Sequence, residues 1–361
     1  MTFVIFTFMS KMEVFVIGVM SGTSLDGVDL VYVKFLKNSY QDFEILHSET
    51  VSYSKKWKER LQDAINFSSE ALKELNIEYG KLLGNVIHEF IGKNQLNNID
   101  FIASHGHTVL HQPKKGITLQ VGDGQVIANK TNQKVICDFR TQDVQLEGQG
   151  APLVPVGDEL LFSAYDFCLN LGGFSNISFK KKDKRIAFDV CPVNIVLNHY
   201  ANKLGLAYDD SGAIASKGNI NQPLLVALNS LKFYKKEAPK SLGLEWVQEE
   251  IYPLIAAFEI EISTILRTFV EHAAMQIGSV IYQNDSVLIT GGGVFNSFLI
   301  ERIEQHANAK IKLPNKQLIN FKEAFIFAFL GLLKQEHQVN CLRSVTGARK
   351  DHSSGKIFYP N

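Results

Sequence analysis

The stretch SGTSLDGVD, at residues 21–29, holds the densest group of chemically useful side chains near the start of the chain. It lies between two runs of apolar, β-branched residues, so we expect a β-hairpin with this stretch at its tip. Glycine lets the backbone approach a ligand closely, and the N–H groups of a tight turn suit an anion. The hydroxyls of Ser21, Thr23 and Ser24 add donors, and Asp26 and Asp29 could hold a hydrated Mg²⁺ beside a phosphate. A turn stabilised by capping side chains explains the same residues equally well.

Two later stretches raise the same question. Asn170-Leu171-Gly172-Gly173 lies between two β-rich runs, and Gly291-Gly292-Gly293 follows the apolar strand VLIT and precedes a helix expected near Asn296. A glycine turn that opens a helix directs N–H groups and the helix dipole toward a ligand. Close packing of a strand on a helix would need the same glycines. Three such tips in one α/β protein favour a site for a nucleotide polyphosphate.

The charged candidates stand near the ends of strands or in apolar helices. Asp189 follows the apolar run RIAF, where its carboxylate could enter a cleft or cap a turn. Arg140 could bind a carboxylate through its planar guanidinium or form a salt bridge with Asp138. Glu323 lies in an almost wholly apolar helix, so we expect a buried carboxylate that needs a partner. A carboxylate at the N-terminus of a helix is the alternative.

Three histidines have a spacing that could suit a metal. His105 and His107 are alternate residues of an expected strand and so share a face, and His111 follows. We also treat His105 and the neighbouring Thr108 as polar groups for binding a substrate.

An alternation of strands and helices must position these residues. We expect a helix from Ser69, with Ser69 as its N-cap and Glu70 in its first turn. Its apolar residues recur at steps of three and four: Leu72, Leu75, Tyr79, Leu82, Val86 and Phe90. We expect further strands at IDFIASHG, KVICDFRT, FCLNL, RIAF and SVLIT, a long helix over about 253–281, and a buried helix at NFKEAFIFAFLGLL. The glycine-rich joint EGQGAPLVP, at 147–155, is the candidate domain boundary.

The composition narrows the function classes. A chain of 361 residues is long enough for two domains, and 45% hydrophobic with 20% charged residues is typical of a globular protein. Because 37 basic residues balance 37 acidic ones, a broad nucleic-acid or anionic-membrane surface is disfavoured. Four scattered cysteines predict neither disulfides nor structural zinc and favour the cytoplasm. We expect no signal peptide at the start, with Met12 as the expected first residue, and no membrane span.

Many blocks along the chain resemble the anhydro-N-acetylmuramic acid kinases, members of the actin/hexokinase/Hsp70-type ATPase superfamily. They follow in order from about residue 13: GVMSGTSLDGVD, HGHTVLHQP, LQVGDGQVIA, DFRTQDVQLEGQGAPLVP, NLGGFSNI, FDVCPVN, APKSLG, TGGGVFN, KEAFIFAF and SVTGA. The number, order and spacing of these blocks make the resemblance specific.

The resemblance implies an α/β fold of two similar ribonuclease-H-like domains with an active-site cleft between them. We place the domains at 13–147, with 340–361 as a candidate to complete it, and at 148–339. The resemblance also implies a homodimer in the cytoplasm. Such an enzyme uses ATP and Mg²⁺ and acts in amino-sugar metabolism, for peptidoglycan recycling. Water would open the anhydro bridge of 1,6-anhydro-N-acetylmuramic acid, and the freed O6 would take the γ-phosphoryl group.

The resemblance also implies roles for particular residues. Asp189 corresponds to the catalytic base, and Glu323 is expected at the sugar or the catalytic water. Arg140 and Asn194 join the sugar-side residues named above, and Asp26 is the expected metal ligand. The ATP-binding residues at the phosphates are Gly22, Thr23, Ser24, Leu25, Asp26, Gly27, Val28 and Asp29. Gly172 and Gly173 are further ATP-binding residues, and Gly291, Gly292 and Gly293 lie nearer the nucleoside.

The chain departs from the usual family pattern at three places. The catalytic block commonly reads FDTGPGN, whereas here Val190, Cys191 and Val193 replace a threonine and two glycines. Leu244 stands where an arginine is usual. The motif HGQTV has glutamine at the position of His107, so His107 is not an expected metal ligand. These departures leave two alternative functions open. The protein could be a kinase of another hexose or amino sugar, or an ATP-binding homologue with altered catalysis.

Overall fold

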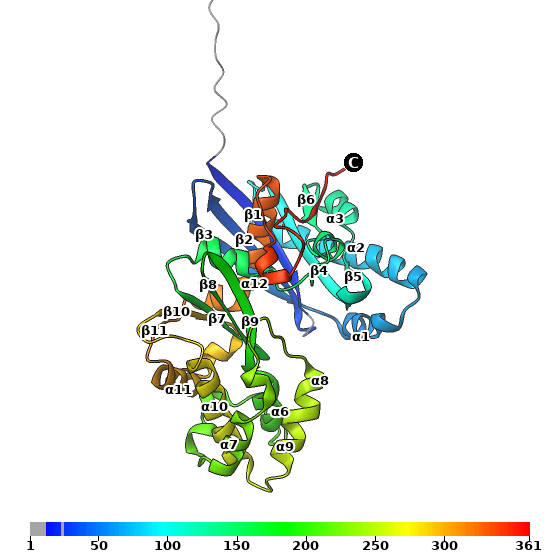
Figure 1. Cartoon of the computed structure of the whole chain (residues 1–361). Helices are drawn as coiled ribbons and strands as arrows, with labels where there is room; N and C mark the ends of the chain where they lie inside the picture. Colours follow the sequence, from blue (N-terminus) through cyan, green and yellow to red (C-terminus); the bar gives the residue numbers. More distant parts are fainter. Residues whose placement is uncertain (1–11, 23–24) are drawn as a thin grey trace, which may run out of the picture. The chain divides into compact units, whose positions relative to one another are not determined.

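The computed structural model describes residues 12–22 and 25–361, which form two compact units (Figure 1). The first unit comprises the chain up to Leu161 together with Glu323–Asn361, and the second comprises Phe162–Lys322. The glycine-rich joint at 147–155 therefore lies inside the first unit, before helix α5 (Pro155–Leu161). The return to the first unit begins at Glu323, earlier than the expected residue 340.

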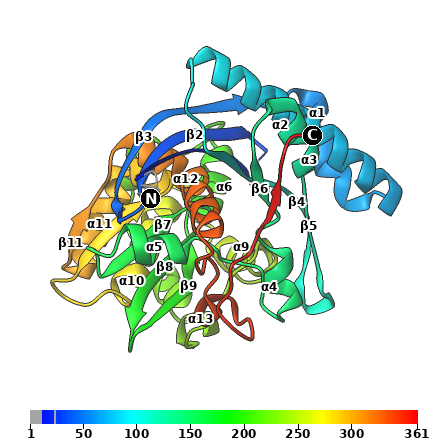
Figure 2. The ribbon, with the colours of Figure 1, turned by 90° about the horizontal axis from the view of Figure 1, so that it is seen from above.

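The first unit is built on one mixed sheet. Its strands are β1 (Glu13–Ser21), β2 (Gly27–Leu36), β3 (Ser39–Ser52), β4 (Phe101–Gln112), β5 (Ile117–Val121), β6 (Val135–Cys137) and β12 (Lys356–Phe358). The order is β3-β2-β1-β4-β6-β12, with β5 paired to β4. Strands β1, β2 and β3 pair antiparallel, β4 lies parallel to both β1 and β6, and the C-terminal β12 runs antiparallel to β6 (Figure 2). The expected hairpin of β1 and β2 is confirmed.

Helices cover both faces of this sheet. Helix α2 (Ser69–Lys93) supplies Leu75, Tyr79 and Leu83 to a core that also contains Ile17 of β1, while α3 (Gly124–Thr131) lies on the same side. The predicted helix is confirmed, but its N-cap is Ser68, whose hydroxyl accepts a hydrogen bond from the N–H of Ala71.

Helix α12 (Lys316–Gln335) packs on the opposite face. Because side chains alternate along a strand, Gly18 faces away from the core that contains Ile17. A Cβ atom added at Gly18 would lie 2.1 Å from the carbonyl oxygen of Ala324, so only glycine lets α12 pack this closely on β1. The apolar residues around much of α12 are buried, as expected.

The second unit repeats this plan. Its strands are β7 (Phe167–Leu171), β8 (Phe174–Lys181), β9 (Lys184–Pro192), β10 (Ser286–Thr290) and β11 (Lys310–Lys312), in the order β9-β8-β7-β10-β11. The first three strands in sequence pair antiparallel, and the last two add in parallel. The strands β3-β2-β1-β4-β6 of the first sheet have the same order and directions, which confirms the prediction of two similar α/β domains of this fold class.

Helices also form the core of the second unit. They include α6 (Asn194–Asn202), α7 (Gln222–Asn229), α9 (Tyr252–Ala256), α10 (Ile262–Gly278) and α11 (Ser297–Ala307). The single helix expected over 253–281 is wrong. It is two helices, because Glu261 has an extended backbone (φ −62°, ψ 149°) at the N-cap position of α10.

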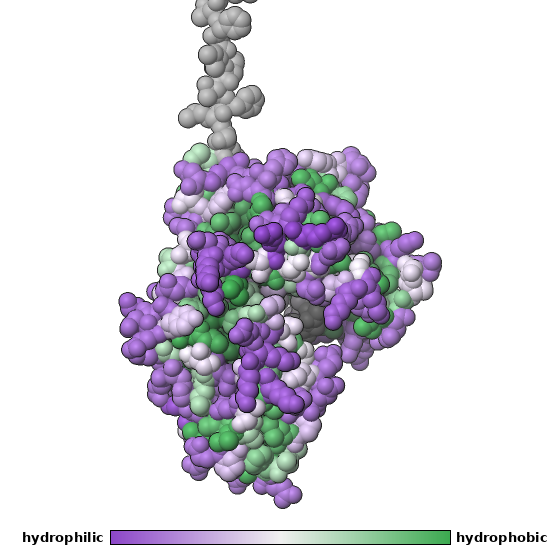
Figure 3. Space-filling view, in the orientation of Figure 1, coloured by the Kyte–Doolittle hydropathy of each residue, from purple (hydrophilic) through white to green (hydrophobic). Residues whose placement is uncertain are grey.

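The remaining helices are short. They are α1 (Lys55–Asp63), α4 (Thr141–Gln145), α8 (Leu244–Trp246) and α13 (Arg343–Thr346), with a π-helical turn at Val247–Ile251. In the part of the chain that the structure describes, no helix is long and apolar enough to cross a membrane. The face drawn in Figure 3 is largely hydrophilic, with smaller apolar areas between the polar side chains.

Candidate functional site

The tip of the first hairpin is shorter than the sequence predicted. Strand β1 ends at Ser21 and β2 begins at Gly27, so Gly27, Val28 and Asp29 are strand residues. Val28 is buried in the core, which leaves only its backbone for a ligand. The tip proper is residues 22–26, of which Thr23 and Ser24 lie outside the described residues.

The two aspartates of the tip have different surroundings. Asp26 is exposed, whereas Asp29 is half-buried and accepts a 2.6 Å hydrogen bond from the hydroxyl of Thr50. Burial raises the pKa of Asp29, the Thr50 hydrogen bond opposes that rise, and the nearby charge of Asp26 adds to it. Leu25 has a positive φ of 60° and its N–H is 3.4 Å from the carbonyl oxygen of Gly22, so the tip turns sharply here. Asp26 is thus the carboxylate of this pair more accessible to a cation.

A buried cluster of hydroxyls lies beneath this tip. The Ser21 hydroxyl is 2.5 Å from that of Tyr53 and accepts a 2.7 Å hydrogen bond from that of Tyr79. Tyr53 and Tyr79 also hydrogen-bond to each other, and Nδ1 of His107 is 3.3 Å from the Ser21 oxygen. These hydrogen bonds connect the end of β1, at the hairpin tip, to α2 and β4. Sequence reasoning missed the two tyrosines, because a buried tyrosine in an amphipathic pattern gives no signal of its hydroxyl partner.

Arg140 and His105 meet in the first unit. Nδ1 of His105 donates to the carbonyl oxygen of Gly106, so its Nε2 accepts the Arg140 Nε–H at 2.9 Å. Nη1 of Arg140 donates to the carbonyl oxygen of Gly150 at 2.5 Å. Burial, then the adjacent guanidinium, hold the pKa of His105 well below its usual value, so this histidine is neutral. The result is a fixed cationic guanidinium beside a neutral imidazole.

The other residues expected near Arg140 behave differently. The alternative Asp138–Arg140 salt bridge is wrong, since Asp138 pairs with Lys356 of β12 at 2.7 Å. The Glu323 carboxylate was expected to be buried, but Glu323 is exposed; its charge favours the protonated form of Arg140. The Thr108 hydroxyl accepts a hydrogen bond from the Gln120 side chain at 3.3 Å.

Asp189 lies within β9, so its interpretation as a turn cap is wrong. The ladder pairs Asn176 with Asp189 but Ser175 with Cys191, which leaves Val190 as the extra residue of a β-bulge. Bulges locally redirect side chains. The Asp189 carboxylate accepts a 2.8 Å hydrogen bond from the Leu242 N–H. Burial raises the pKa of Asp189, and this hydrogen bond partly opposes the rise.

The two glycine tips of the second unit come together. Strands β7 and β10 are parallel neighbours, so their carboxyl ends meet at one edge of the sheet. Gly291 has a φ of 86°, and a Cβ atom there would lie 2.6 Å from Oδ1 of Asn170. The predicted helix start is confirmed with Asn296 as the N-cap of α11, although a 3₁₀ turn over Gly292–Phe295 intervenes.

Asn194 joins the same edge as the first residue of α6. Its side-chain amide donates to the carbonyl oxygen of Leu171 at 3.4 Å, and its N–H donates to that of Gly172 at 3.3 Å. Gly173 and Gly292 are exposed, and nothing lies within 4 Å of a Cβ atom added at Gly292. The second unit therefore assembles Gly172, Gly173, Asn194 and Gly291–Gly293 into one small-residue edge.

The spacing of His105, His107 and His111, which could suit a metal, does not bring their ligand atoms together among the described residues. Over residues 12–22 and 25–361, the metal-ligating atoms that cluster are those of Asp143, Cys341 and His352, and His107 instead contacts Ser21. All four cysteines are buried and none forms a disulfide bond.

Comparison with known proteins decides which family these elements belong to. Residues 14–360 match the family described as anhydro-N-acetylmuramic acid kinase. The chain belongs to this family. A relative of that name from Haemophilus influenzae is 34% identical, over 95% of this chain and 97% of its own. Another from Bacillus cereus is 31% identical, over 96% of this chain and 99% of its own.

Solved structures give more distant likenesses. The activator of the 2-hydroxyisocaproyl-CoA dehydratase from Clostridium difficile is 14% identical with a TM-score of 0.44, over 89% of this chain and 97% of that one. A xylulose kinase from Lactobacillus acidophilus is 12% identical with a TM-score of 0.43, over 96% and 94%.

The departures from the usual pattern of the anhydro-N-acetylmuramic acid kinase family point mostly into the core. Val190, Cys191 and Val193 are all buried, and Val193 has a φ of −133° and a ψ of −97°, outside the usual α and β regions. The Ser175 hydroxyl donates to the Cys191 carbonyl oxygen at 3.0 Å. Leu244, by contrast, is 45% exposed at the start of α8. In the catalytic block, the changed side chains fill space behind Asp189 and Asn194 instead of replacing either.

Proposed function

We propose that this protein is an ATP-dependent kinase of 1,6-anhydro-N-acetylmuramic acid, acting in peptidoglycan recycling. The reaction hydrolyses the anhydro bridge and phosphorylates O6, giving N-acetylmuramic acid 6-phosphate. The observation that carries the proposal is the family match over residues 14–360, within which Asp189 is retained and held on a rigid strand. A cytoplasmic location belongs to the proposal because ATP is the phosphoryl donor.

Asp189 is the proposed general base. Water is a poor nucleophile until a positioned carboxylate accepts its proton. The Leu242 N–H fixes Oδ2 of Asp189, and the bulge at Val190 sets the direction of the side chain. Because burial raises its pKa, this carboxylate binds a proton more tightly than an ordinary aspartate. This property suits a base that must accept a proton from water.

The residues present fit a Mg·ATP ligand. In the first unit the exposed Asp26 at the hairpin tip would hold Mg²⁺ beside the phosphates. In the second unit the open position at Gly292 lets a ligand approach the backbone. Gly172, Gly173, Gly291 and Gly293 would line the same part of the nucleotide site. When bound, the metal neutralises charge on the phosphates.

The sugar-side proposal centres on Arg140. Its guanidinium is preorganised by His105 and the Gly150 carbonyl, and a carboxylate such as that of the lactyl ether is its natural partner. Thr108, Asn194 and the exposed Glu323 are proposed as further polar contacts to the sugar or to water. We also propose a homodimer, which light scattering of the purified chain would test.

The first test measures ADP release from Mg·ATP with 1,6-anhydro-N-acetylmuramic acid. We expect turnover to fall by about 10²- to 10⁴-fold in Asp189→Asn, because the amide cannot accept the proton. Activity of the unchanged protein should fall as the pH drops through an apparent pKa above the ordinary aspartate value of 3.8, since only ionised Asp189 is a base.

Asp183→Asn is the matched control, since Asp183 is exposed at the β8–β9 turn of the same unit and should leave turnover unchanged. N-acetylmuramic acid and N-acetylglucosamine are run in parallel. Faster turnover of either free sugar would replace the proposed substrate, and ATP binding without any sugar turnover would reject the kinase assignment.

A further inference from the structure

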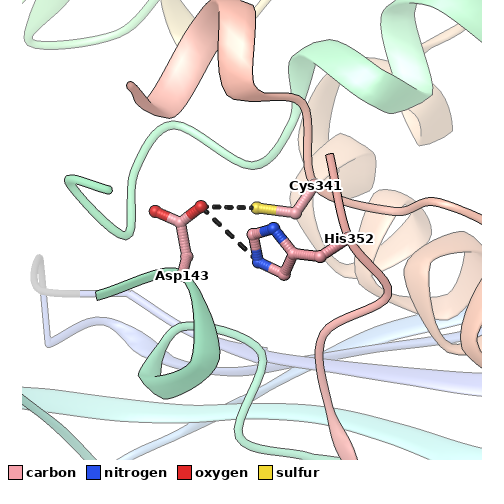
Figure 4. Close-up of side chains that lie close together, drawn as sticks. All are labelled: Asp143, Cys341 and His352. Atoms are coloured by element: carbon pink, nitrogen blue, oxygen red, sulfur yellow. Dashed lines mark hydrogen bonds and ion pairs between the residues drawn. The ribbon is translucent and has the colours of Figure 1, made fainter. Parts of the chain in front are cut away.

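Three side chains that the proposed reaction does not use meet deep in the first unit. Asp143 of α4, Cys341 and His352 are all buried (Figure 4). The Cys341 thiol donates to Oδ1 of Asp143 at 3.1 Å, and Nε2 of His352 is 3.6 Å from the same oxygen. The three ligand atoms all lie within 4.8 Å of one another. A thiol, an imidazole and a carboxylate are a donor set typical of zinc.

The backbone aims two of these side chains at the third. Cys341 and His352 form an isolated antiparallel bridge, in which each N–H donates to the carbonyl oxygen of the other. Directly paired residues of antiparallel strands place their side chains on the same face. That face is the one on which Asp143 lies, so residues 198 apart along the chain converge at one point.

The imidazole of His352 is oriented as a metal ligand would be. Its Nδ1 donates a 3.1 Å hydrogen bond to the carbonyl oxygen of Lys350, which leaves Nε2 as the ring nitrogen available to a metal. Nε2 is buried and makes no hydrogen bond with any described residue. A buried polar atom without a partner is costly, and ligating histidines commonly donate their other N–H to a backbone carbonyl.

The carboxylate is equally fixed. Oδ1 of Asp143 accepts a 2.7 Å hydrogen bond from the Thr346 hydroxyl, and Oδ2 accepts one of 2.7 Å from the Gly150 N–H. With zinc–ligand bonds of about 2.0 to 2.3 Å, the ligand atoms of a tetrahedral site lie about 3.3 to 3.6 Å apart. The observed 3.1 Å and 3.6 Å separations therefore need shifts of only a fraction of an ångström.

We propose that Asp143, Cys341 and His352 bind one zinc ion through Oδ1, Sγ and Nε2. On binding, the Cys341 thiol loses its proton to solvent and the thiolate sulfur bonds to the metal. The fourth position of a tetrahedral ion goes to water or to the Thr346 hydroxyl. Because the site is buried, it is structural and does not activate a nucleophile.

The site would stabilise the part of the chain that holds Arg140. Asp143 accepts from the Gly150 N–H, and the Gly150 carbonyl accepts from Arg140. Bound zinc would thus stabilise the contact of the segment that carries Cys341 and His352 with α4 and the loop at 147–150. This effect on Arg140 rests on the proposed function, whereas zinc binding itself does not.

Metal binding to the full-length protein is measured without any turnover assay. The purified chain is stripped with a zinc-selective chelator, then titrated with Zn²⁺ in competition with a chromophoric chelator and, separately, with Co²⁺. We expect one zinc per chain, a thiolate-to-cobalt charge-transfer band with the visible bands of a tetrahedral ion, and a melting temperature restored by Zn²⁺ but not by Mg²⁺.

Variants assign the ligands. Cys341→Ser should abolish the charge-transfer band, and Thr346→Val, which removes a hydrogen bond to the ligating carboxylate, should weaken zinc affinity by about 10- to 100-fold. Cys137→Ser is the matched control, a buried cysteine of the same unit outside the cluster, and should keep the band. An unchanged protein that binds no stoichiometric zinc and gives no charge-transfer band would overturn the proposal, even if the variants fail to fold. The cluster would then be a metal-free hydrogen-bond network.

Discussion

At the scale of single residues, burial sets the charge of the histidines near the hairpin tip. His107 is 4% exposed and contacts the Ser21 hydroxyl, and burial lowers its pKa to about 4. The unfolded chain has a histidine pKa near 6.5, so protonation favours unfolding. The stability that neutral His107 contributes is complete above about pH 6.5 and declines as the pH falls toward 4.

His107→Gln, which introduces the glutamine usual in this family, tests this linkage. Between pH 7 and pH 5 the unchanged protein should lose about 2 kcal/mol of unfolding free energy that the variant keeps, because one pKa unit corresponds to about 1.4 kcal/mol. Urea unfolding at both pH values measures the difference. His88→Gln changes an exposed histidine of α2 and serves as the control. An equal pH dependence in all three proteins would show that His107 is not the titrating group.

At the scale of elements, the junction of β9 and α6 determines what the altered catalytic block means. Val190, Cys191 and Val193 are at most 2% exposed and belong to the core of the second unit, together with residues of α10. Asp189 and Asn194 bracket them and are only half-buried. We infer that the valines compensate for lost glycines by filling the core, with little effect on the sugar.

The variant Val193→Ala distinguishes a role of Val193 in core packing from a role in binding the sugar. Removing two buried carbons should cost about 2 kcal/mol of unfolding free energy. KM for the anhydro sugar should stay nearly the same, because the lost atoms face the core. Val226→Ala, at a 62% exposed valine of α7, should change stability by less than about 0.5 kcal/mol. Urea unfolding measures the unfolding free energy, and initial rates measure KM. A several-fold change in KM with unchanged stability would instead place Val193 at the sugar.

At the scale of the whole molecule, the two units differ in continuity. The second is one unbroken segment, Phe162–Lys322, whereas the first joins the chain up to Leu161 with Glu323–Asn361. The C-terminal part supplies the half of α12 that packs on β1 at Gly18, the edge strand β12, and both side chains that cluster with Asp143.

The two fragments should therefore behave differently when produced alone. Residues 162–322 should fold and unfold cooperatively in urea, because their sheet and core are complete. Residues 12–161 should not, because the absence of α12 would leave one face of their sheet exposed, but joining them to 323–361 through a flexible linker should restore cooperative unfolding. Circular dichroism during urea titration measures both. Independent folding of 12–161 would contradict this division.

The sequence by itself determined the repeating strand and helix pattern, the two opening hairpins, and the family. Those features follow from local periodicity and from motifs such as SGTSLDGVD and FDVCPVN, in which neighbouring residues carry the signal. It also identified Asp189, through the family pattern, and Arg140, because its guanidinium suits a carboxylate.

Only the tertiary structure decided which partners those residues have. Arg140 pairs with His105 and not with Asp138, Glu323 is exposed, and the expected helix over 253–281 is broken before α10. The convergence of Asp143, Cys341 and His352 is the extreme case, since a contact between segments about two hundred residues apart leaves no local pattern. Hydrogen-bond partners and burial depend on how distant segments pack against each other, which the spacing of residues along the sequence does not encode.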